Sequence, residues 1–173
     1  YLEEKLAAEV LLTKTEPGTR YYDHSFAVVA DPNTGEVLAM AGKQVKTDSN
    51  GHNYIIDYTP GVVTTSVTPG SIVKGASMLV GYNTGVIKMG EYMLDECIKV
   101  AGTPQKCSSK TLGTIDDITA LAKSSNVYQF KTAIRVNGQE YYNGMKLNFN
   151  QKAFDTYRSM YNSFGLGVKT GID

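Results

Sequence analysis

Residues 68–74 read Thr68-Pro69-Gly70-Ser71-Ile72-Val73-Lys74, and they carry the most informative signal in the sequence. A Pro-Gly pair stands ahead of apolar residues, which predicts a mostly buried helix from Ser71 to about Val80. Positions i and i+3 share one face of a helix, so the hydroxyl of Ser71 and the amine of Lys74 can touch. A serine needs a nearby base to attack a carbonyl at neutral pH, and a desolvated lysine amine is such a base. The stretch therefore predicts nucleophilic catalysis at a helix N-terminus, whose free N–H groups would also stabilise an oxyanion.

The composition restricts the partners of the chain. A length of 173 residues fits one domain or part of a larger one, and 42% hydrophobic with 20% charged residues is ordinary for a soluble globular protein. The 17 basic and 17 acidic side chains cancel, so we expect neither nucleic acid nor an anionic membrane surface as a partner. No apolar run approaches the length of a membrane span, and the first residues do not resemble a signal peptide, so the piece itself is expected to be soluble.

Hydrophobic periodicity and turn residues predict the order of the helices and strands. An amphipathic helix should open the chain and end near Pro17, and a hairpin should pair strands at 26–30 and 36–40. Residues 43–68 are polar or lack a clear period, which predicts loop or irregular structure. The later helices are expected at 71–80, from a capped start at 114 to 124, at 127–134, and more weakly at 152–161.

The S-x-x-K pattern gains its specificity from context. Taken alone, it occurs by chance in a chain with this many serines and lysines. Here it is the only match in the sequence, it opens an apolar helix, and the only S-x-N, at Ser124-Ser125-Asn126, follows it. S-x-x-K together with S-D-N and K-T-G is the mark of penicillin-binding proteins and class A β-lactamases.

On these residues the chain resembles the transpeptidase domain of class B penicillin-binding proteins. The segments that carry the resemblance lie in the family's order, at 30–40, 68–74 and 164–173. The resemblance implies an α+β fold of the penicillin-binding-protein and serine β-lactamase type, with an antiparallel sheet and helices. It also implies that residues 1–173 are the N-terminal portion of one such domain, incomplete in this chain.

The resemblance assigns roles to the residues of the two motifs. Ser71 would be the acylated nucleophile, and Lys74 would be its general base. Ser124 would pass a proton toward the leaving group. Asn126 would hold Lys74 and hydrogen-bond the peptide amide of the substrate. Ser125, the variable middle position, receives no catalytic role and is expected to be a surface or helix-cap serine.

A third motif in the sequence, Lys169-Thr170-Gly171, has the letters of K-T-G in the wrong setting. The family's motif lies on a strand at the edge of the active site, where its Lys and Thr bind the substrate carboxylate and apolar residues precede it. Here Gly165 and Gly167 precede it, as in a glycine-rich segment upstream of the family's true motif. We therefore expect Lys169 and Thr170 to be a decoy, with the catalytic strand C-terminal to this chain.

The cysteines and histidines offer no metal site. Cys97 and Cys107 flank a stretch with the turn residues Gly102-Thr103-Pro104, which leaves a disulfide and two unpaired thiols both open. Further Cys or His ligands are not near them in sequence. His24 and His52 stand alone and are expected to be structural or solvated, so we expect neither metal nor cofactor.

The activity implied by the resemblance is a serine D,D-transpeptidase. It would crosslink peptidoglycan stem peptides through an acyl-enzyme on Ser71, and β-lactams would inhibit it covalently. One alternative is a serine β-lactamase, although Glu140 does not sit in a segment like that family's deacylation loop. The other alternative is a non-enzymatic penicillin-sensing domain.

The same resemblance implies partners and a location. The partners would be a peptidoglycan stem peptide, β-lactam antibiotics, the C-terminal remainder of the same domain and a lipid-II polymerase. The protein would act on the extracytoplasmic face of the bacterial cell membrane, held by an upstream anchor that this chain lacks. Without the carboxylate-binding strand, the isolated chain should be a poor enzyme.

Overall fold

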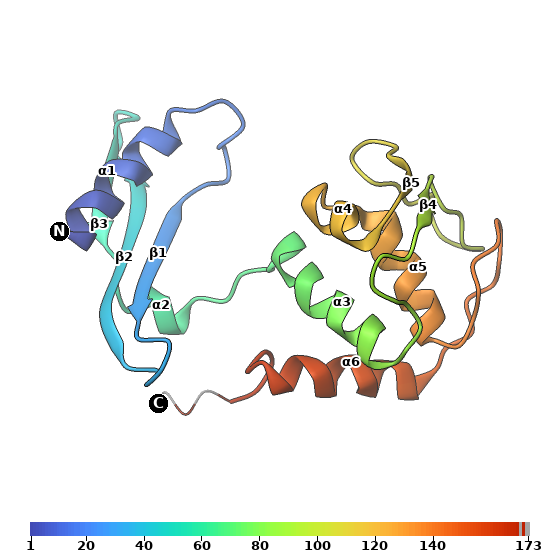
Figure 1. Ribbon diagram of the computed structural model, residues 1–173. Helices are drawn as coiled ribbons and strands as arrows, with labels where there is room; N and C mark the ends of the chain where they lie inside the picture. Colours follow the sequence, from blue (N-terminus) through green and yellow to red (C-terminus); the bar gives the residue numbers. More distant parts are fainter. Residues whose placement is uncertain (170, 172–173) are drawn as a thin grey trace. The chain divides into compact units, whose positions relative to one another are not determined.

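The computed structural model describes residues 1–169 and 171, and the chain forms two compact units, Tyr1–Val67 and Thr68–Asp173. The first unit joins a helix to a small sheet (Figure 1). The second unit is mostly helical and carries both motifs. The mixture of helices and antiparallel strands is the α+β composition predicted from the sequence.

The N-terminal unit is a three-stranded antiparallel sheet with the order β1-β2-β3. Its elements are α1 (Leu2–Lys14), β1 (His24–Ala30), β2 (Val37–Thr47), β3 (Asn53–Asp57) and the short α2 (Gly61–Thr64). Helix α1 packs against β2 and buries Val10 completely. The predicted opening helix and the β1–β2 hairpin are therefore confirmed.

The prediction of loop or irregular structure over residues 43–68 is wrong for two strand segments and for the short helix α2. Strand β2 continues to Thr47, and β3 pairs with it from Asn53 to Asp57. Strand β3 lies at the sheet edge with both its ends, Asn53 and Asp57, exposed, so it needs no strict apolar alternation. In the central strand β2, Lys43 and Val45 are buried. The turn between them is set by Asp48, whose side chain accepts hydrogen bonds from the backbone N–H groups of Asn50 and His52, both at 2.8 Å.

The C-terminal unit packs its helices around two apolar clusters. Its elements are the 3₁₀ helix η1 (Gly70–Val73), α3 (Lys74–Asn83), β4 (Met93–Asp95), β5 (Gly113–Ile115), α4 (Asp117–Ala122), α5 (Asn126–Val136) and α6 (Gln151–Ser163). The first cluster contains Met78 and Tyr128, and the second contains Val127 and Met145. Tyr128 and Val127 are neighbours on α5, which makes this helix the centre of the unit.

Helices α3 and α5 approach closely at Gly81. A Cβ atom at this position would lie 2.7 Å from the Thr132 side chain and 2.8 Å from Ile87, so only glycine fits. This contact fixes α3, which begins with Lys74, relative to α5, which begins with Asn126.

The predicted helix from Ser71 differs from the structure in two respects. Its first turn is the 3₁₀ helix η1, and the α-helix starts only at Lys74. It is also less buried than expected, since Ile72 is 84% exposed and Leu79 is 45% exposed. The reason is that α3 contacts α5 and α6 on one side and leaves the other side open.

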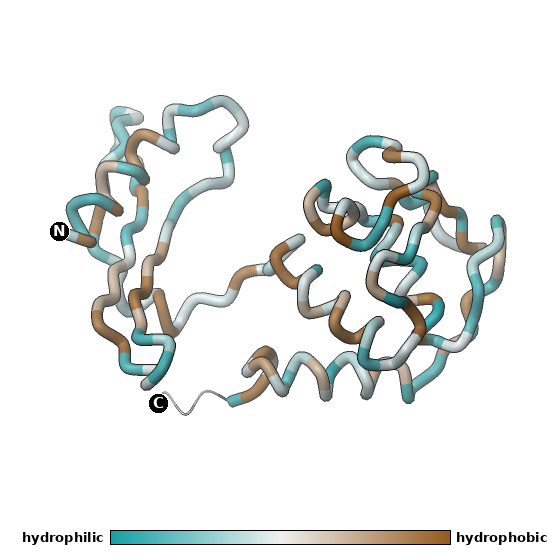
Figure 2. Tube along the Cα trace, in the orientation of Figure 1, coloured by the Kyte–Doolittle hydropathy of each residue, from teal (hydrophilic) through white to brown (hydrophobic). Residues whose placement is uncertain are grey.

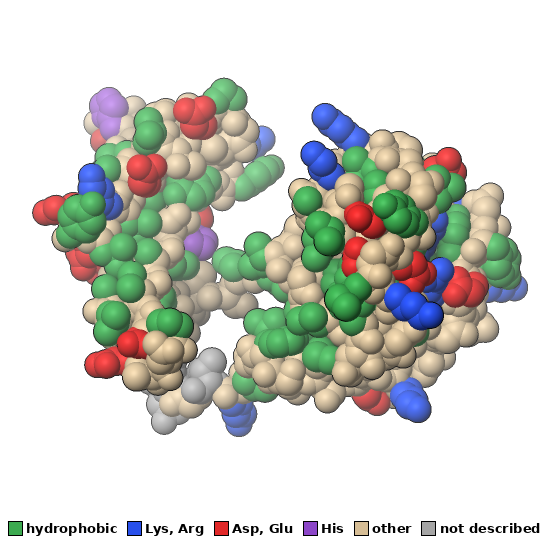
Figure 3. Space-filling view, in the orientation of Figure 1, with side chains coloured by type: hydrophobic (Ala, Val, Ile, Leu, Met, Phe, Trp, Pro, Cys, Tyr) green, Lys and Arg blue, Asp and Glu red, His purple; other side chains and the backbone are tan. Residues whose placement is uncertain are grey.

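The surface carries both signs of charge. Lys and Arg side chains lie among Asp and Glu side chains on the visible face (Figure 3), in agreement with the balanced composition. Hydrophobic stretches alternate with hydrophilic ones along the chain (Figure 2). Among the helices of the described residues, none is long and apolar enough to cross a membrane.

Candidate active site

Ser71 lies on η1, where the backbone leaves Gly70 and enters the helix. Gly70 has a φ of 61°, a left-handed conformation that favours glycine. The Ser71 side chain is exposed, and the structure records no hydrogen bond between it and another described residue. The turn borders a pocket of about 750 Å³, whose lining includes Ile72 and Val73 from the turn and Tyr161 from α6. Ser71 is thus an accessible hydroxyl, and its neighbours in the turn, not Ser71 itself, line this pocket.

Lys74 is the centre of a hydrogen-bond cluster that joins the two motifs. Its Nζ donates to the carbonyl oxygen of Ser124 at 2.6 Å, to Ser124 Oγ at 3.0 Å and to Asn126 Oδ1 at 2.6 Å. These partners lie 50 and 52 residues later in the chain. The structure therefore brings together Lys74, Ser124 and Asn126, while Ser71 lies one turn away without a hydrogen bond to the amine.

The surroundings of Lys74 lower the pKa of its amine. Each hydrogen-bond partner is an uncharged oxygen, and burial lowers the pKa of Lys74 below its ordinary value. The negative charge of Asp95 acts in the opposite direction and raises this pKa, but it does not cancel the effect of burial. Only the neutral amine can accept a proton from a serine, and a lowered pKa makes this form easier to reach.

Ser124 is held in a strained backbone conformation. Its φ is 55°, and among the described residues it is the one non-glycine residue with a positive φ. This conformation costs a non-glycine residue about 1 to 2 kcal/mol. It lets the carbonyl and the hydroxyl of Ser124 both contact Lys74. Backbone strain of this kind is common at functional sites.

Asn126 begins helix α5, directly after a serine cap. Ser125 Oγ accepts the N–H of Tyr128 at 2.9 Å, so the predicted role of Ser125 as a helix cap is confirmed. The surface position that was the other possibility is wrong, since Ser125 is completely buried. Asp116 caps α4 in the same way by accepting the N–H of Thr119 at 2.8 Å, which confirms the acidic start predicted for that helix.

A disulfide-closed hairpin lies beside Asn126. Cys97 and Cys107 form a disulfide, and Ile98 pairs with Lys106 in an antiparallel bridge. Asn126 Nδ2 donates to the carbonyl oxygen of Cys107 at 3.3 Å. The sequence alone did not decide whether these cysteines form a disulfide or remain free thiols. In the structure, the disulfide-closed hairpin supports Asn126.

Sequence reasoning missed two polar residues near this site. Ser108 follows the disulfide, and its Oγ accepts the backbone N–H of Asn126 at 3.0 Å. Asp95 is 2% exposed at the end of β4, and its Oδ2 accepts a hydrogen bond from Ser108 Oγ at 2.7 Å. Neither residue belongs to a motif, and the only available signal was their position at the two ends of the Cys97–Cys107 stretch.

The remaining candidate residues lie apart from this cluster. Lys169 is exposed, follows α6 outside any strand and makes no hydrogen bond with another described residue, while Thr170 lies outside the described residues. His24 contacts Asp23, and His52 Nδ1 lies 3.4 Å from Asp48 Oδ2. Within residues 1–169 and 171, no three His, Cys, Asp or Glu side chains form a group that could hold a metal ion.

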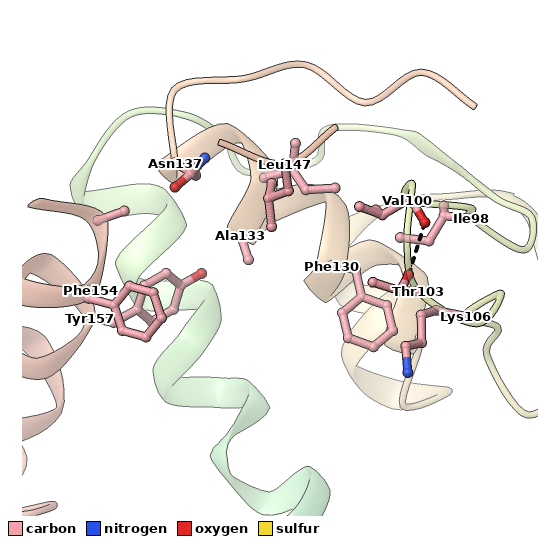
Figure 4. A pocket seen from close by; sticks show the side chains of 12 residues that line it. Ile98, Val100, Thr103, Lys106, Phe130, Ala133, Asn137, Leu147, Phe154 and Tyr157 are labelled. Atoms are coloured by element: carbon pink, nitrogen blue, oxygen red, sulfur yellow. Dashed lines mark hydrogen bonds between the residues drawn. The ribbon is translucent and has the colours of Figure 1, made fainter. Parts of the chain in front are cut away.

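A second, apolar pocket of about 410 Å³ lies between the hairpin, α5 and α6. Figure 4 shows Phe154 and Tyr157 from α6 on one side, and Phe130 from α5 facing the hairpin on the other. Its lining contains none of the residues that hydrogen-bond Lys74. It is therefore not the pocket of the candidate active site.

Comparisons with known proteins match this site to a family. The family model described as the penicillin binding protein transpeptidase domain matches residues 25–173. Penicillin-binding protein 2A of Bacillus subtilis (strain 168) is 44% identical over 173 residues, which is 99% of this chain and 24% of that protein. Penicillin-binding protein H of the same strain is 40% identical over 170 residues, covering 98% of this chain and 24% of that protein.

The fold agrees with these matches. The structure of penicillin-binding protein 2B from Streptococcus pneumoniae (strain R6) superposes with a TM-score of 0.83 at 31% identity, covering 96% of this chain and 28% of that one. The chain thus spans about a quarter of the length of the curated relatives that it matches. With its matching residues and fold, the chain belongs to the penicillin-binding protein transpeptidase domain family, among the class B members.

Proposed function

We propose that this chain carries the nucleophile and the base of a serine D,D-transpeptidase that crosslinks peptidoglycan stem peptides. The single observation that carries the proposal is the position of the Lys74 amine, which contacts Ser124 Oγ at 3.0 Å and Asn126 Oδ1 at 2.6 Å. Two motifs far apart in the chain meet at one amine whose pKa is lowered by burial. Family membership supports a transpeptidase role for such a centre.

In the proposed reaction, Ser71 attacks the carbonyl of the penultimate D-Ala. Neutral Lys74 takes the hydroxyl proton as the Ser71 Oγ–carbon bond forms. The peptide bond to the terminal D-Ala then breaks, and the proton passes through Ser124 to the leaving amine. An amine from another stem peptide next attacks the ester and restores Ser71. Asn126 keeps Lys74 in place through Oδ1 and offers its side-chain amide to the substrate.

The nucleophile is tested by acylation of a complete domain that contains this sequence. We expect a labelled penicillin to form a stable adduct that peptide mass spectrometry places on Ser71, and Ser71→Ala to remove it. Ser159→Ala, which changes an exposed serine of α6, is the matched control and should be labelled like the wild type. An adduct on another residue, or no adduct with the folded wild type, would refute the proposal.

The same protein separates the two alternatives. Rapid turnover of a chromogenic β-lactam would indicate a β-lactamase, but Glu140 is 3.0 Å from Arg135 and is engaged in an exposed ion pair rather than poised beside Lys74. Stable acylation without crosslinking of stem peptides would indicate a penicillin-sensing domain. Crosslinked product together with a slowly hydrolysed adduct is the transpeptidase result.

The partners and the location follow from the proposed reaction. Stem peptides and β-lactams are the proposed ligands, with the carboxylate-binding strand supplied by the C-terminal remainder of the domain and not by Lys169. The reaction belongs on the extracytoplasmic face of the bacterial membrane, where stem peptides lie. A lipid-II polymerase is the proposed source of the glycan strands.

A further inference from the structure

A buried carboxylate lies beneath the S-x-N motif. Asp95, at the end of β4, is 2% exposed. Its Oδ2 accepts hydrogen bonds from the hydroxyls of Ser108, at 2.7 Å, and of Ser125. Its Oδ1 has no hydrogen-bond partner among the described residues. A buried carboxylate with one unpaired oxygen lowers the stability of the fold. This cost suggests that Asp95 has a role other than packing.

The two serines connect this carboxylate to the start of α5. Ser108 Oγ accepts the N–H groups of Asn126 at 3.0 Å and Val127 at 3.2 Å. Ser125 Oγ accepts the N–H of Tyr128 at 2.9 Å. The first N–H groups of a helix have no partner within the helix, so these hydroxyls satisfy the first turn of α5.

The carboxylate fixes the direction of the hydrogen bonds that Ser108 and Ser125 make with Asp95. An ionised carboxylate can only accept, and each serine hydroxyl has a single proton. Both hydroxyls must therefore donate to Asp95 and turn their lone pairs toward the helix N–H groups. An amide in place of Asp95 could donate as well as accept, and the orientation of both hydroxyls would be lost.

We propose that Asp95 is a positioning residue that, through Ser108 and Ser125, fixes the first turn of α5 and thereby places Asn126 and Ser124 against Lys74. This inference rests on the proposed function for its effect on catalysis. The geometry that supports it is independent, since the hydrogen bonds of Asp95 go to Ser108 and Ser125 and not to Ser71.

Asp95 also contributes charge to its surroundings. Two lysines feel this charge, Lys74 from α3 and Lys131 from α5, and Asp95 raises the pKa of both against the lowering effect of burial. Glu96 and Arg135 act on Lys131 as well, whereas Asp95 is the charged group that acts on Lys74. Removing the Asp95 charge should therefore let Lys74 lose its proton at lower pH.

The test compares Asp95→Asn and Ser108→Ala with the wild type in a complete domain containing this sequence. We expect each variant to be acylated by labelled penicillin roughly 10- to 100-fold more slowly, the loss typical of a misplaced catalytic group. In Asp95→Asn the acidic limb of the pH–rate profile should also move to lower pH, whereas in Ser108→Ala it should stay nearer its original position. A residue that only maintained stability would not shift this limb.

Asp117→Asn is the matched control. Asp117 is also 2% exposed and accepts hydrogen bonds from the hydroxyl of Tyr82 and from the N–H of Gly90 at 3.1 Å, but it contacts neither Asn126 nor Lys74. It should lower the melting temperature and leave the acylation rate of the folded protein and its pH profile unchanged. Wild-type rates and an unmoved acidic limb in Asp95→Asn would overturn the proposal.

Hydrogen exchange provides a readout that does not depend on activity. The N–H groups of Asn126 and Val127 should exchange faster in Ser108→Ala than in the wild type. In Asp117→Asn, the exchange rates of these two groups should change little. If the wild type is not acylated, the proposed function fails, and the exchange result still decides the positioning. Unchanged protection of these two N–H groups would overturn it.

Discussion

Two lysines, one in each unit, are each surrounded by oxygen atoms, but these surroundings shift the pKa of the two amines in opposite directions. Lys43 in the N-terminal unit is 8% exposed and lies 3.1 Å from carboxylate oxygens of both Glu3 and Asp57. Burial opposes its charge, but the two carboxylates outweigh burial and raise its pKa. Lys74 contacts only uncharged oxygens, and its pKa is lowered. The charge of the partners, more than burial itself, separates a structural lysine from a candidate base.

The largest effect should come from removing the ability of Lys74 to lose its proton. Arg keeps a positive charge and hydrogen-bond donors but does not deprotonate in proteins. We expect Lys74→Arg to slow the acylation of Ser71 by penicillin roughly 100- to 10,000-fold, the range of general base catalysis. Lys43→Arg is the matched control and should keep the wild-type rate. Equal rates for both variants would break the distinction between the two lysines.

Ser124 supplies two of the oxygens around Lys74 from a strained backbone conformation. Ser124→Gly removes the hydroxyl and relieves the positive φ, while Ser124→Ala removes the hydroxyl and keeps the strain. The Gly variant should be more stable to urea than the Ala variant by about 1 kcal/mol. Both should be acylated more slowly than the wild type, by roughly 100-fold. A Gly variant less stable than the Ala variant would show that the conformation is not strained.

Removing the disulfide tests whether the Cys97–Cys107 hairpin beside Asn126 stabilises the C-terminal unit. Cys97 and Cys107 are separated by 10 positions, and closing a loop of this size stabilises by about 2 to 3 kcal/mol. We expect the Cys97→Ser/Cys107→Ser double variant to lose about this much in urea unfolding. The wild type should behave like the double variant once it is reduced. A reduced wild type as stable as the oxidised protein would contradict this role.

The smallest effect should appear in the pH dependence of stability. A raised pKa in the folded state gives stability that is present below the ordinary value of 10.5 and is lost as pH rises through the folded pKa of Lys43. A lowered pKa acts in the opposite sense, so Lys74 should make stability increase with pH between its folded pKa and 10.5. Urea unfolding of Lys43→Met and Lys74→Met from neutral to alkaline pH should remove these opposite slopes. If the two lysines contributed slopes of the same sign to the pH dependence of stability, their surroundings could not shift the two pKa values in opposite directions.

Local patterns in the sequence predicted the elements whose signal is contained in a short stretch. The opening helix, the first hairpin and the cap at Asp116 each depend on neighbouring residues. The motif order also predicted that the residues around Ser71 and Ser124 belong together, through a resemblance and not through geometry. The meeting of Lys74 with Asn126 depends on a long-range contact between α3 and α5, for which Gly81 leaves space.

Other features depend on contacts that a single sequence does not display. Strand β3 is only five residues long and lies at a sheet edge, and its pairing with β2 becomes visible only in three dimensions. The positive φ of Ser124 is imposed by its surroundings, since serine does not favour it. Asp95 and Ser108 lie outside every motif. Their importance comes from the hydrogen bonds through which they support the first turn of α5.

The most direct test of the account is a titration of the two lysine side chains by NMR, in a complete domain with isotope-labelled lysine, assigned through Lys43→Arg and Lys74→Arg. We expect Lys74 to lose its proton below pH 10.5 and Lys43 to lose its proton above this value. A Lys74 that titrates at or above Lys43 would contradict the claim that its uncharged surroundings prepare it to act as a base.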